Sequence, residues 1–193
     1  MKEIKVKEGA IWKTTNSVII TIPEYATHVK QSSKKYIKVN GQTLYSGMNH
    51  HTRNKVVREM KDSIINALPY DMEDLSEYIP FKINLEIHNV PNYQTVKYMS
   101  KKGEFSFKGV DPTVEYEPTF DVDNQWIWIK CFTDVIAKDL NLIVDDTVKY
   151  IPINGEIEYV PIDKLEDRKL VFTIERITDV NKLDNLEKFY GKY

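Results

Sequence analysis

Short runs of apolar, often β-branched residues predict the strands of a sheet. FKINLEIHNV, residues 81–90, has an apolar residue at every second position, which indicates a strand with one buried face. SVIITIP, residues 17–23, is β-branched and ends at a proline, and KLVFTIERI, residues 169–177, has a similar composition. We therefore expect strands at these three places, the last of which closes the sheet.

Three further segments have the composition of hairpins. Residues 34–47 alternate around an Asn-Gly pair, and residues 144–162 contain another; such pairs favour two-residue turns. A long segment, 91–120, follows the strand that ends near residue 90. Inside it, TVKYMSKKGEFSFKGV indicates a hairpin that turns at Lys102-Gly103. We expect this hairpin to be an insertion.

Helical spacing of apolar residues predicts two main helices. In residues 49–69, apolar residues recur every three or four positions from Val57 to Leu68, and a proline then ends the pattern. A second helix is expected at about 124–140. A short C-terminal helix is expected at about 179–190.

The order of these elements is typical of an α+β fold. We expect a mixed β-sheet with two main helices packed on it, an inserted β-hairpin and a short C-terminal helix. At 193 residues the chain is long enough to bury a substantial core, and we expect a single domain over 1–193.

The composition is that of a folded protein of the cytosol. Hydrophobic residues make up 41% of the chain and charged residues 29%, with a net charge of −2 that gives no global sign of a nucleic-acid partner. Cys131 is the only cysteine, which excludes an internal disulfide framework and a cysteine-based zinc cluster. No apolar run suits a signal peptide or approaches the roughly 18 residues of a membrane span. We therefore expect a cytoplasmic protein without a membrane partner.

Two pairs of aspartates flank the second predicted helix. Asp121 and Asp123 precede it, and Asp145 and Asp146 follow it. Each pair has an ordinary structural explanation, since aspartates cap helices and are common in turns. The alternative is a metal site: a helix and a short return loop can place both pairs together. Close carboxylates repel each other, and a hard divalent cation such as Mg²⁺ offsets that repulsion.

Lys130 and Asp134 continue this pattern along the helix. If the helix extends from Asp123, Lys130 lies nearly two turns further on the same face, and Asp134 lies one turn beyond it. A lysine beside a metal–carboxylate site stabilises negative charge on a phosphate. The alternative is a solvated Lys130–Asp134 pair that contributes little to stability.

The segment FDVDNQWIWIKCFTDVIAKDLNLIVDDTVKYI resembles the motif of RusA-type Holliday junction resolvases. That family shows Asp-x-Asp-Asn, a lysine with an aspartate four residues later, and then Asp-Asp at the start of a strand. Here the lysine follows the second aspartate by seven residues, whereas the family places it four residues after. VIITIP, YSGMNHHTR, FKINLEIH and LVFTIERI are similar to further segments of the family, in the same order.

The resemblance implies a RusA-like fold and a homodimeric endonuclease that depends on Mg²⁺, with Mn²⁺ as the alternative ion. It implies that Asp121, Asp123 and Asp146 are catalytic metal ligands, with Asp145 replacing Asp146 if the loop register differs by one, and that Lys130 is catalytic. A metal-activated water would cleave phosphodiester bonds, nicking four-way DNA junctions symmetrically. Such enzymes are typical of phages and prophages, so the expected location is the cytoplasm of a bacterial or phage-infected cell.

Basic residues suggest where DNA would bind. Arg53 matches a family position at the start of the first helix, and Lys97, Lys101, Lys102 and Lys108 line the expected hairpin. A solvated surface explains the four lysines equally well. An alternative to the enzyme also stays open: a RusA-like fold that binds branched DNA without cutting it, or that assembles with other phage proteins.

Overall fold

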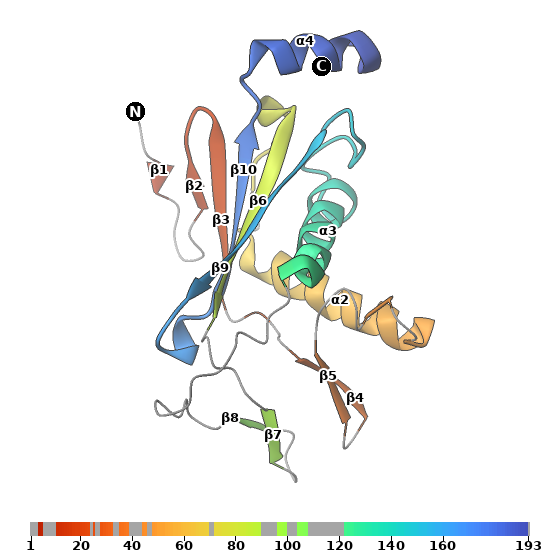
Figure 1. Cartoon of the computed structure of the whole chain (residues 1–193), viewed down its shortest axis with the longest axis vertical. Coiled ribbons are helices and arrows are strands. Elements are labelled where there is room, and N and C mark those ends of the chain that lie inside the picture. The colour runs from red at the N-terminus through yellow and green to blue at the C-terminus, as the bar shows by residue number, and fades with distance from the viewer. Residues whose placement is uncertain are drawn as a thin grey trace.

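The computed structural model confirms the α+β fold, with a mixed sheet and helices α2 (His50–Ala67) and α3 (Trp126–Asp134) on one of its faces (Figure 1). It describes residues 4–5, 11–23, 25, 28–32, 35–38, 44–45, 48–69, 72–89, 96–99, 104–107 and 122–192. Within these residues, no helix combines the length and the apolar character needed to cross a membrane.

Six strands form the sheet, in the order β1-β2-β3-β10-β6-β9. Their bounds are Ile4–Lys5 (β1), Ile11–Lys13 (β2), Ser17–Pro23 (β3), Lys169–Arg176 (β10), Phe81–Asn89 (β6) and Ile153–Pro161 (β9). Neighbouring strands are antiparallel, except that β6 and β9 are parallel. The predicted strands at 17–23, 81–90 and 169–177 are confirmed. The last of them, β10, lies inside the sheet between β3 and β6, so it does not form an edge.

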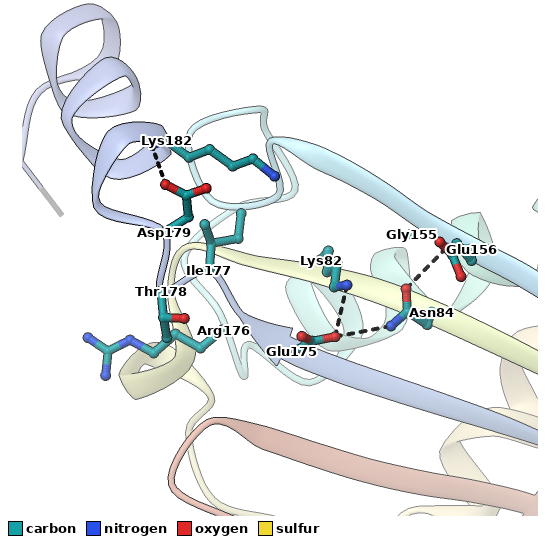
Figure 2. A pocket seen from close by; sticks show the side chains of 10 residues that line it. All are labelled: Lys82, Asn84, Gly155, Glu156, Glu175, Arg176, Ile177, Thr178, Asp179 and Lys182. Atoms are coloured by element: carbon teal, nitrogen blue, oxygen red, sulfur yellow. Dashed lines mark hydrogen bonds and ion pairs between the residues drawn. The ribbon is translucent and has the colours of Figure 1, made fainter.

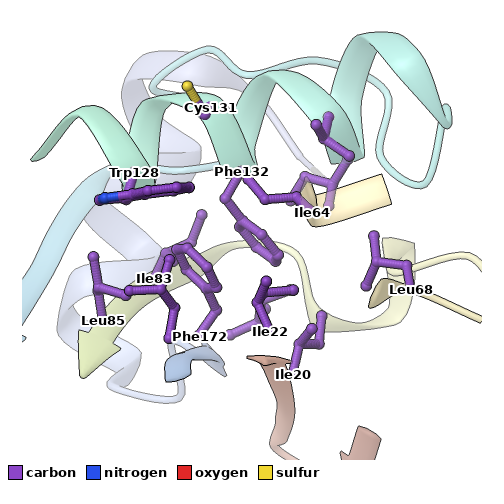
Figure 3. Close-up of a cluster of buried hydrophobic side chains, with 14 of the residues drawn as sticks. Ile20, Ile22, Ile64, Leu68, Ile83, Leu85, Trp128, Cys131, Phe132 and Phe172 are labelled. Carbon is purple, nitrogen blue, oxygen red and sulfur yellow. The ribbon is translucent and has the colours of Figure 1, made fainter. Parts of the chain in front are cut away.

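The core lies between the sheet and the two helices (Figure 3). Every second residue of β6 is buried along its whole length, as the alternation predicts. From α2, the buried residues are Val56, Met60 and Ile64. Val57, where the sequence pattern placed the start of the apolar stripe, is only partly buried, because a helix repeats its face every 3.6 residues and Val56 lies four residues before Met60.

The inserted hairpin is confirmed, and the first predicted hairpin is not. Strand β7 (Val96–Met99) pairs antiparallel with β8 (Glu104–Phe107), and Lys102-Gly103 lies outside the described residues. Strand β5 (Lys35–Lys38) pairs with the preceding strand β4 (His28–Ser32). The turn expected at Asn40-Gly41 lies outside the described residues and Leu44-Tyr45 are helical, so the described residues do not show the hairpin expected within 34–47. Alternation marked a strand there correctly, but it carries no information on which neighbour the strand pairs with.

The Asn-Gly pair at 154–155 lies within β9, so the hairpin expected within 144–162 is wrong. Ile83 pairs with Asn154 and Leu85 with Ile157, so Asn84 alone faces two residues, Gly155 and Glu156. This is a β-bulge. The Asn84 side chain accepts a hydrogen bond from the Glu156 backbone N–H at 3.1 Å (Figure 2).

Gly155 is required at the bulge because the two strands approach each other closely. A Cβ atom at this position would overlap the carbonyl oxygen of Ile83 and the side-chain oxygen of Asn84. The residue that resembled a turn glycine is therefore a glycine of close backbone approach.

The C-terminal helix is confirmed as α4 (Val180–Tyr190). The side chain of Asp179 caps it by accepting hydrogen bonds from the backbone N–H groups of Asn181 and Lys182. No residue of α4 is fully buried, so this helix contributes little to the core.

Gly155→Ala should lower the free energy of unfolding by about 1–3 kcal/mol or more, because the added methyl group meets backbone atoms that cannot move without breaking the β6–β9 pairing. Urea unfolding measures the change. Gly191→Ala is the control: Gly191 has a φ of +79° at the end of α4 and no atom within 4 Å of the added methyl. The strain at Gly191 is confined to α4, so the unfolding midpoint of the core should stay unchanged. An unaltered midpoint for Gly155→Ala would contradict the bulge geometry.

Candidate functional site

The first aspartate pair belongs to the start of a helical segment over 122–139. Asp121 lies outside the described residues, and Asp123 lies in the 3₁₀ helix Val122–Gln125. Helix α3 follows directly, and a π-helical turn, Val135–Asp139, continues it. The N-cap of α3 is Gln125. Neither aspartate therefore occupies the N-cap position of α3. Asp121 directly precedes the 3₁₀ helix in sequence, so capping of the whole helical segment stays the structural alternative to a metal site.

The position of this segment in the fold is that of a strand–helix–strand crossover. Helix α3 lies between β6 and β9 in the chain, and these two strands are parallel neighbours. The 3₁₀ helix that contains Asp123 lies against β9. In parallel crossovers the helix begins beside the carboxyl ends of the strands, which is the end where ligands commonly bind. Asp123 therefore lies at the end of the crossover that is best suited to a site.

Asp146 lies at the opposite end of the helical segment. Its carboxylate accepts a hydrogen bond from the Lys138 ammonium at 2.8 Å, and the same ammonium donates to Asp134 at 3.0 Å. Lys61 of α2 contacts Asp134 at 3.5 Å and Asp139 at 3.1 Å. These ion pairs connect α2, the last turns of the helical segment and the loop that follows.

The ion pairs also set the protonation of this cluster. The hydrogen bond from Lys138 holds the pKa of Asp146 below its ordinary value, and hydrogen bonds to Asp146 and Asp134 raise the pKa of Lys138. Asp145 has a local role, since its Oδ1 accepts a hydrogen bond from the backbone N–H of Asp146 at 2.7 Å. The negative charge of Asp146 is thus already balanced by a lysine.

Asp123 does not meet Asp145 and Asp146 within one chain. At 1.5 Å per residue, the helix rises by about 16 Å from Asp123 to Asp134, beside which Lys138 holds Asp146. Two oxygen ligands of one magnesium ion lie at most about 4 Å apart. The structure therefore does not bring Asp146, or its neighbour Asp145, to Asp123 as the sequence pattern predicted. The reason is the parallel crossover, because the return loop leads to the start of β9, at the far end of the helix.

The described side chains also offer no alternative metal site. Among the side chains that the structure describes, no group of three or more His, Cys, Asp or Glu residues could hold a metal ion. The side chains of Asp121 and Asp123 are not among them. A metal at the first aspartate pair therefore stays a prediction.

Lys130 lies midway along the helix with half of its side chain exposed, and it approaches Asp134 at 3.8 Å. This is the Lys130–Asp134 pair that the sequence predicted as the structural explanation, with the lysine half exposed and the aspartate largely buried. Asp134 thus has three lysines around it, since Lys61 and Lys138 also contact it. A catalytic role for Lys130 stays a prediction.

Cys131 is not a candidate nucleophile. It lies on the buried side of α3, and burial, with a smaller effect of Asp134, raises the pKa of its thiol to about 12. The thiol is protonated at neutral pH, whereas the thiolate is the reactive form.

The predicted DNA-binding residues are only partly described. Arg53 lies in the second turn of α2, with its guanidinium 5.3 Å from the centre of the Tyr45 ring. Lys97 lies in β7. Lys101, Lys102 and Lys108 lie outside the described residues.

Two features of the surface were missed in the sequence. Lys138 pairs with Asp134 four residues earlier, and that spacing alone could have identified it. The contact between the exposed rings of Tyr45 and Trp126 carries no sequence signal, because the two residues are far apart in the chain. The sequence does separate Trp126 from Trp128, which is buried against Tyr25, since residues two apart lie on nearly opposite sides of a helix.

Neither the search of protein-family models nor the search of curated proteins finds a match for this chain. The functional assignment therefore depends on the residues of the chain and their positions in the fold.

Lys138→Met should raise the pKa of Asp146 toward its ordinary value, because the hydrogen bond from Lys138 is the largest cause of its lowering. A pKa lower in the folded than in the unfolded chain stabilises the fold above about pH 4, and this contribution is lost as the pH falls through the folded pKa. At pH 7 the variant should therefore have a free energy of unfolding lower than that of the wild type by less than about 1 kcal/mol, as expected for a pair with partly exposed partners. Well below pH 4 the two free energies should be equal.

Titration of the Asp146 carboxyl carbon by NMR measures the first effect, and unfolding at the two pH values measures the second. Lys55→Met is the control, because Lys55 pairs with Glu59 on α2 at 3.7 Å and touches no part of this cluster. If Asp146 titrates identically in wild type and Lys138→Met, the ion pair does not form in solution.

Proposed function

We propose that this chain is a metal-dependent, RusA-like endonuclease that acts on branched DNA. The observation that supports the proposal best is the location of Asp123 and Asn124 of the Asp-x-Asp-Asn motif. They immediately precede the helix of a parallel crossover, at the end where ligands commonly bind in such folds. The α+β fold with a mixed sheet is compatible with the fold that the family resemblance implies.

The proposed metal ligands are Asp121 and Asp123. Magnesium is commonly bound through one or two carboxylates, with water and substrate phosphates completing its coordination, so two aspartates are sufficient. The bound ion would activate a water molecule and stabilise charge on the phosphate that is cleaved. Mn²⁺ prefers the same oxygen ligands and is the alternative ion. Asp145 and Asp146 are not required in this arrangement.

The homodimer is part of the same proposal. A four-way junction has two-fold symmetry in its simplest form, and symmetric nicks require two active sites related by that symmetry. The position of Lys130 sets a further condition. At 1.5 Å per residue it lies about 10 Å along the helix from Asp123, so its long side chain would have to extend to reach the phosphate.

The second candidate is a protein that binds branched DNA without cutting it, or one that assembles with other phage proteins. The specific observation in its favour is the pairing of Asp146 with Lys138, which leaves the proposed metal site without the third aspartate of the family motif. Both candidates predict binding to branched DNA or to a partner, but only the enzyme predicts metal-dependent nicking.

Asp123→Asn should abolish the nicking of a synthetic four-way junction in Mg²⁺, while junction binding is kept or becomes tighter. The substitution preserves the shape of the side chain but removes a charge that binds metal and repels phosphate. Asp146→Asn is the matched comparison, and it should retain most of the activity because its carboxylate serves the ion pair with Lys138. Gel analysis of end-labelled junctions measures both.

Three other outcomes would change the conclusion. No nicking by the wild-type chain with Mg²⁺ or Mn²⁺ over a range of pH, together with junction binding, decides for the second candidate. Loss of nicking in Asp146→Asn but not in Lys138→Met would mean that Asp146 is a metal ligand after all. Wild-type nicking by Asp123→Asn would remove Asp123 from the site.

The β7–β8 hairpin should bind DNA phosphates through Lys97, Lys101, Lys102 and Lys108. Replacing all four with glutamine should weaken junction affinity and reduce the slope of log affinity against log salt by about 0.9 for each phosphate that is no longer neutralised. Nicking of bound junction should survive. Replacing Lys182 and Lys188 of α4 is the control and should leave the slope unchanged. An unchanged slope in the hairpin variant, or dissociation of its dimer, would show that the hairpin does not bind DNA.

A further inference from the structure

Tyr45 and Trp126 form a pair of exposed aromatic rings beside the start of α3. Their ring centres are 5.4 Å apart and their planes are tilted by 32°. Tyr45 is 45% exposed and Trp126 is 41% exposed, although aromatic side chains of this size are mostly buried in folded chains. The other exposed aromatic residues in the described part of the chain, Phe189 and Tyr190, lie on α4.

The pair has a cation beside it. The Arg53 guanidinium lies 5.3 Å from the centre of the Tyr45 ring, within the range of a cation–π contact. The first turn of α2 contains no acidic residue, and Lys55 in the next turn is paired with Glu59 at 3.7 Å. A negatively charged ligand with an aromatic face matches this combination of rings and an arginine.

The exposed area of the two rings suits a small planar ligand. Together the rings expose on the order of 200 Å². The surface is close to the size of one planar base. Aromatic rings beside cations are the usual means of binding single-stranded nucleic acid, because every base offers a π face.

We propose that Trp126, supported by Tyr45 and flanked by Arg53, is a stacking platform for one unpaired nucleobase of bound DNA. Tyr45 restricts the indole to one orientation, and Arg53 provides a cation for the adjoining phosphate. Trp126 follows Asp123 by three residues, less than one helical turn, so the stacked base belongs to a nucleotide near the proposed cleavage position. The platform rests on the proposed function in taking DNA as the ligand, but it needs neither metal nor cleavage.

The test compares two short oligonucleotides of equal length, one of thymidines and one of abasic sugar-phosphate units. Fluorescence anisotropy measures the affinity of the full chain for each, in EDTA and at one fixed salt concentration, because phosphate contacts depend on salt. The wild-type chain should prefer the thymidine oligonucleotide by about 5–150-fold, the range expected for stacking of one base.

Trp126→Ala should lose this preference, with its affinity for the abasic oligonucleotide unchanged. Trp126→Phe should keep most of it, because phenylalanine retains a ring for stacking. Phe189→Ala is the matched control, since it removes an exposed ring on α4 and should change neither affinity. A 2-aminopurine placed within the thymidine oligonucleotide should be quenched on binding to the wild type and to Trp126→Phe, but not to Trp126→Ala.

Three results would overturn the platform: equal affinities of the wild type for both oligonucleotides, equal weakening on both in Trp126→Ala, or conversion of Trp126→Ala to a monomer in sedimentation. The last would place Trp126 in a dimer interface. Failure of the proposed function is distinguishable, because a chain that stacks the base in EDTA and nicks no junction in any metal keeps the platform and loses the nuclease. A chain that nicks junctions but binds the two oligonucleotides equally keeps the nuclease and loses the platform.

Discussion

The stacking of Phe132 on Phe172 attaches helix α3 to the sheet. The rings are nearly parallel, with centres 4.1 Å apart, and both side chains are fully buried. Phe172 belongs to β10, which pairs with β3 on one side and β6 on the other, so the contact attaches α3 to the middle of the sheet. Met60 and Ile64 of α2 enter the same core. This packing holds α3 against the sheet (Figure 3), while the parallel pairing of β6 with β9 sets the direction in which the helix runs.

The elements that sequence predicted correctly are those whose pattern reports burial. The alternation in β6 and the repeat in α2 each reflect one buried face, and burial is what selects these residues. The errors concern pairing. An Asn-Gly pair has the same local composition in a turn and in a bulge, and only the position of Ile83 opposite β9 shows why Gly155 is needed. Strand partners are decided by the whole sheet, which no short segment of sequence contains.

The same distinction applies to the candidate site. The helix expected at about 124–140, between the two aspartate pairs, is present as α3 and its flanking turns, but the sequence does not show whether the flanking strands are parallel or antiparallel. A parallel connection returns the chain to the far end of the sheet, so the helix separates Asp123 from Asp146 instead of joining them. Lys138 then becomes the nearest cation to Asp146. The offset of Trp126 from Trp128 predicts that the two indoles lie on nearly opposite sides of the helix, but not which of them is exposed. The contact of Trp126 with Tyr45 depends on tertiary packing.

A net charge of −2 restricts how this chain could hold DNA. Long-range attraction to phosphate requires an excess of positive charge, and the whole chain has none. Three lysines in the described part, Lys61, Lys130 and Lys138, are engaged by the carboxylates around Asp134. In the proposed complex, binding would therefore depend on local contacts, namely the lysines of the β7–β8 hairpin and base stacking. Of these, base stacking is the contact that salt weakens least. At the proposed platform, an exposed indole beside an arginine would supply it without any change in net charge. It would favour DNA whose bases are unpaired, because paired bases inside a duplex offer no free face.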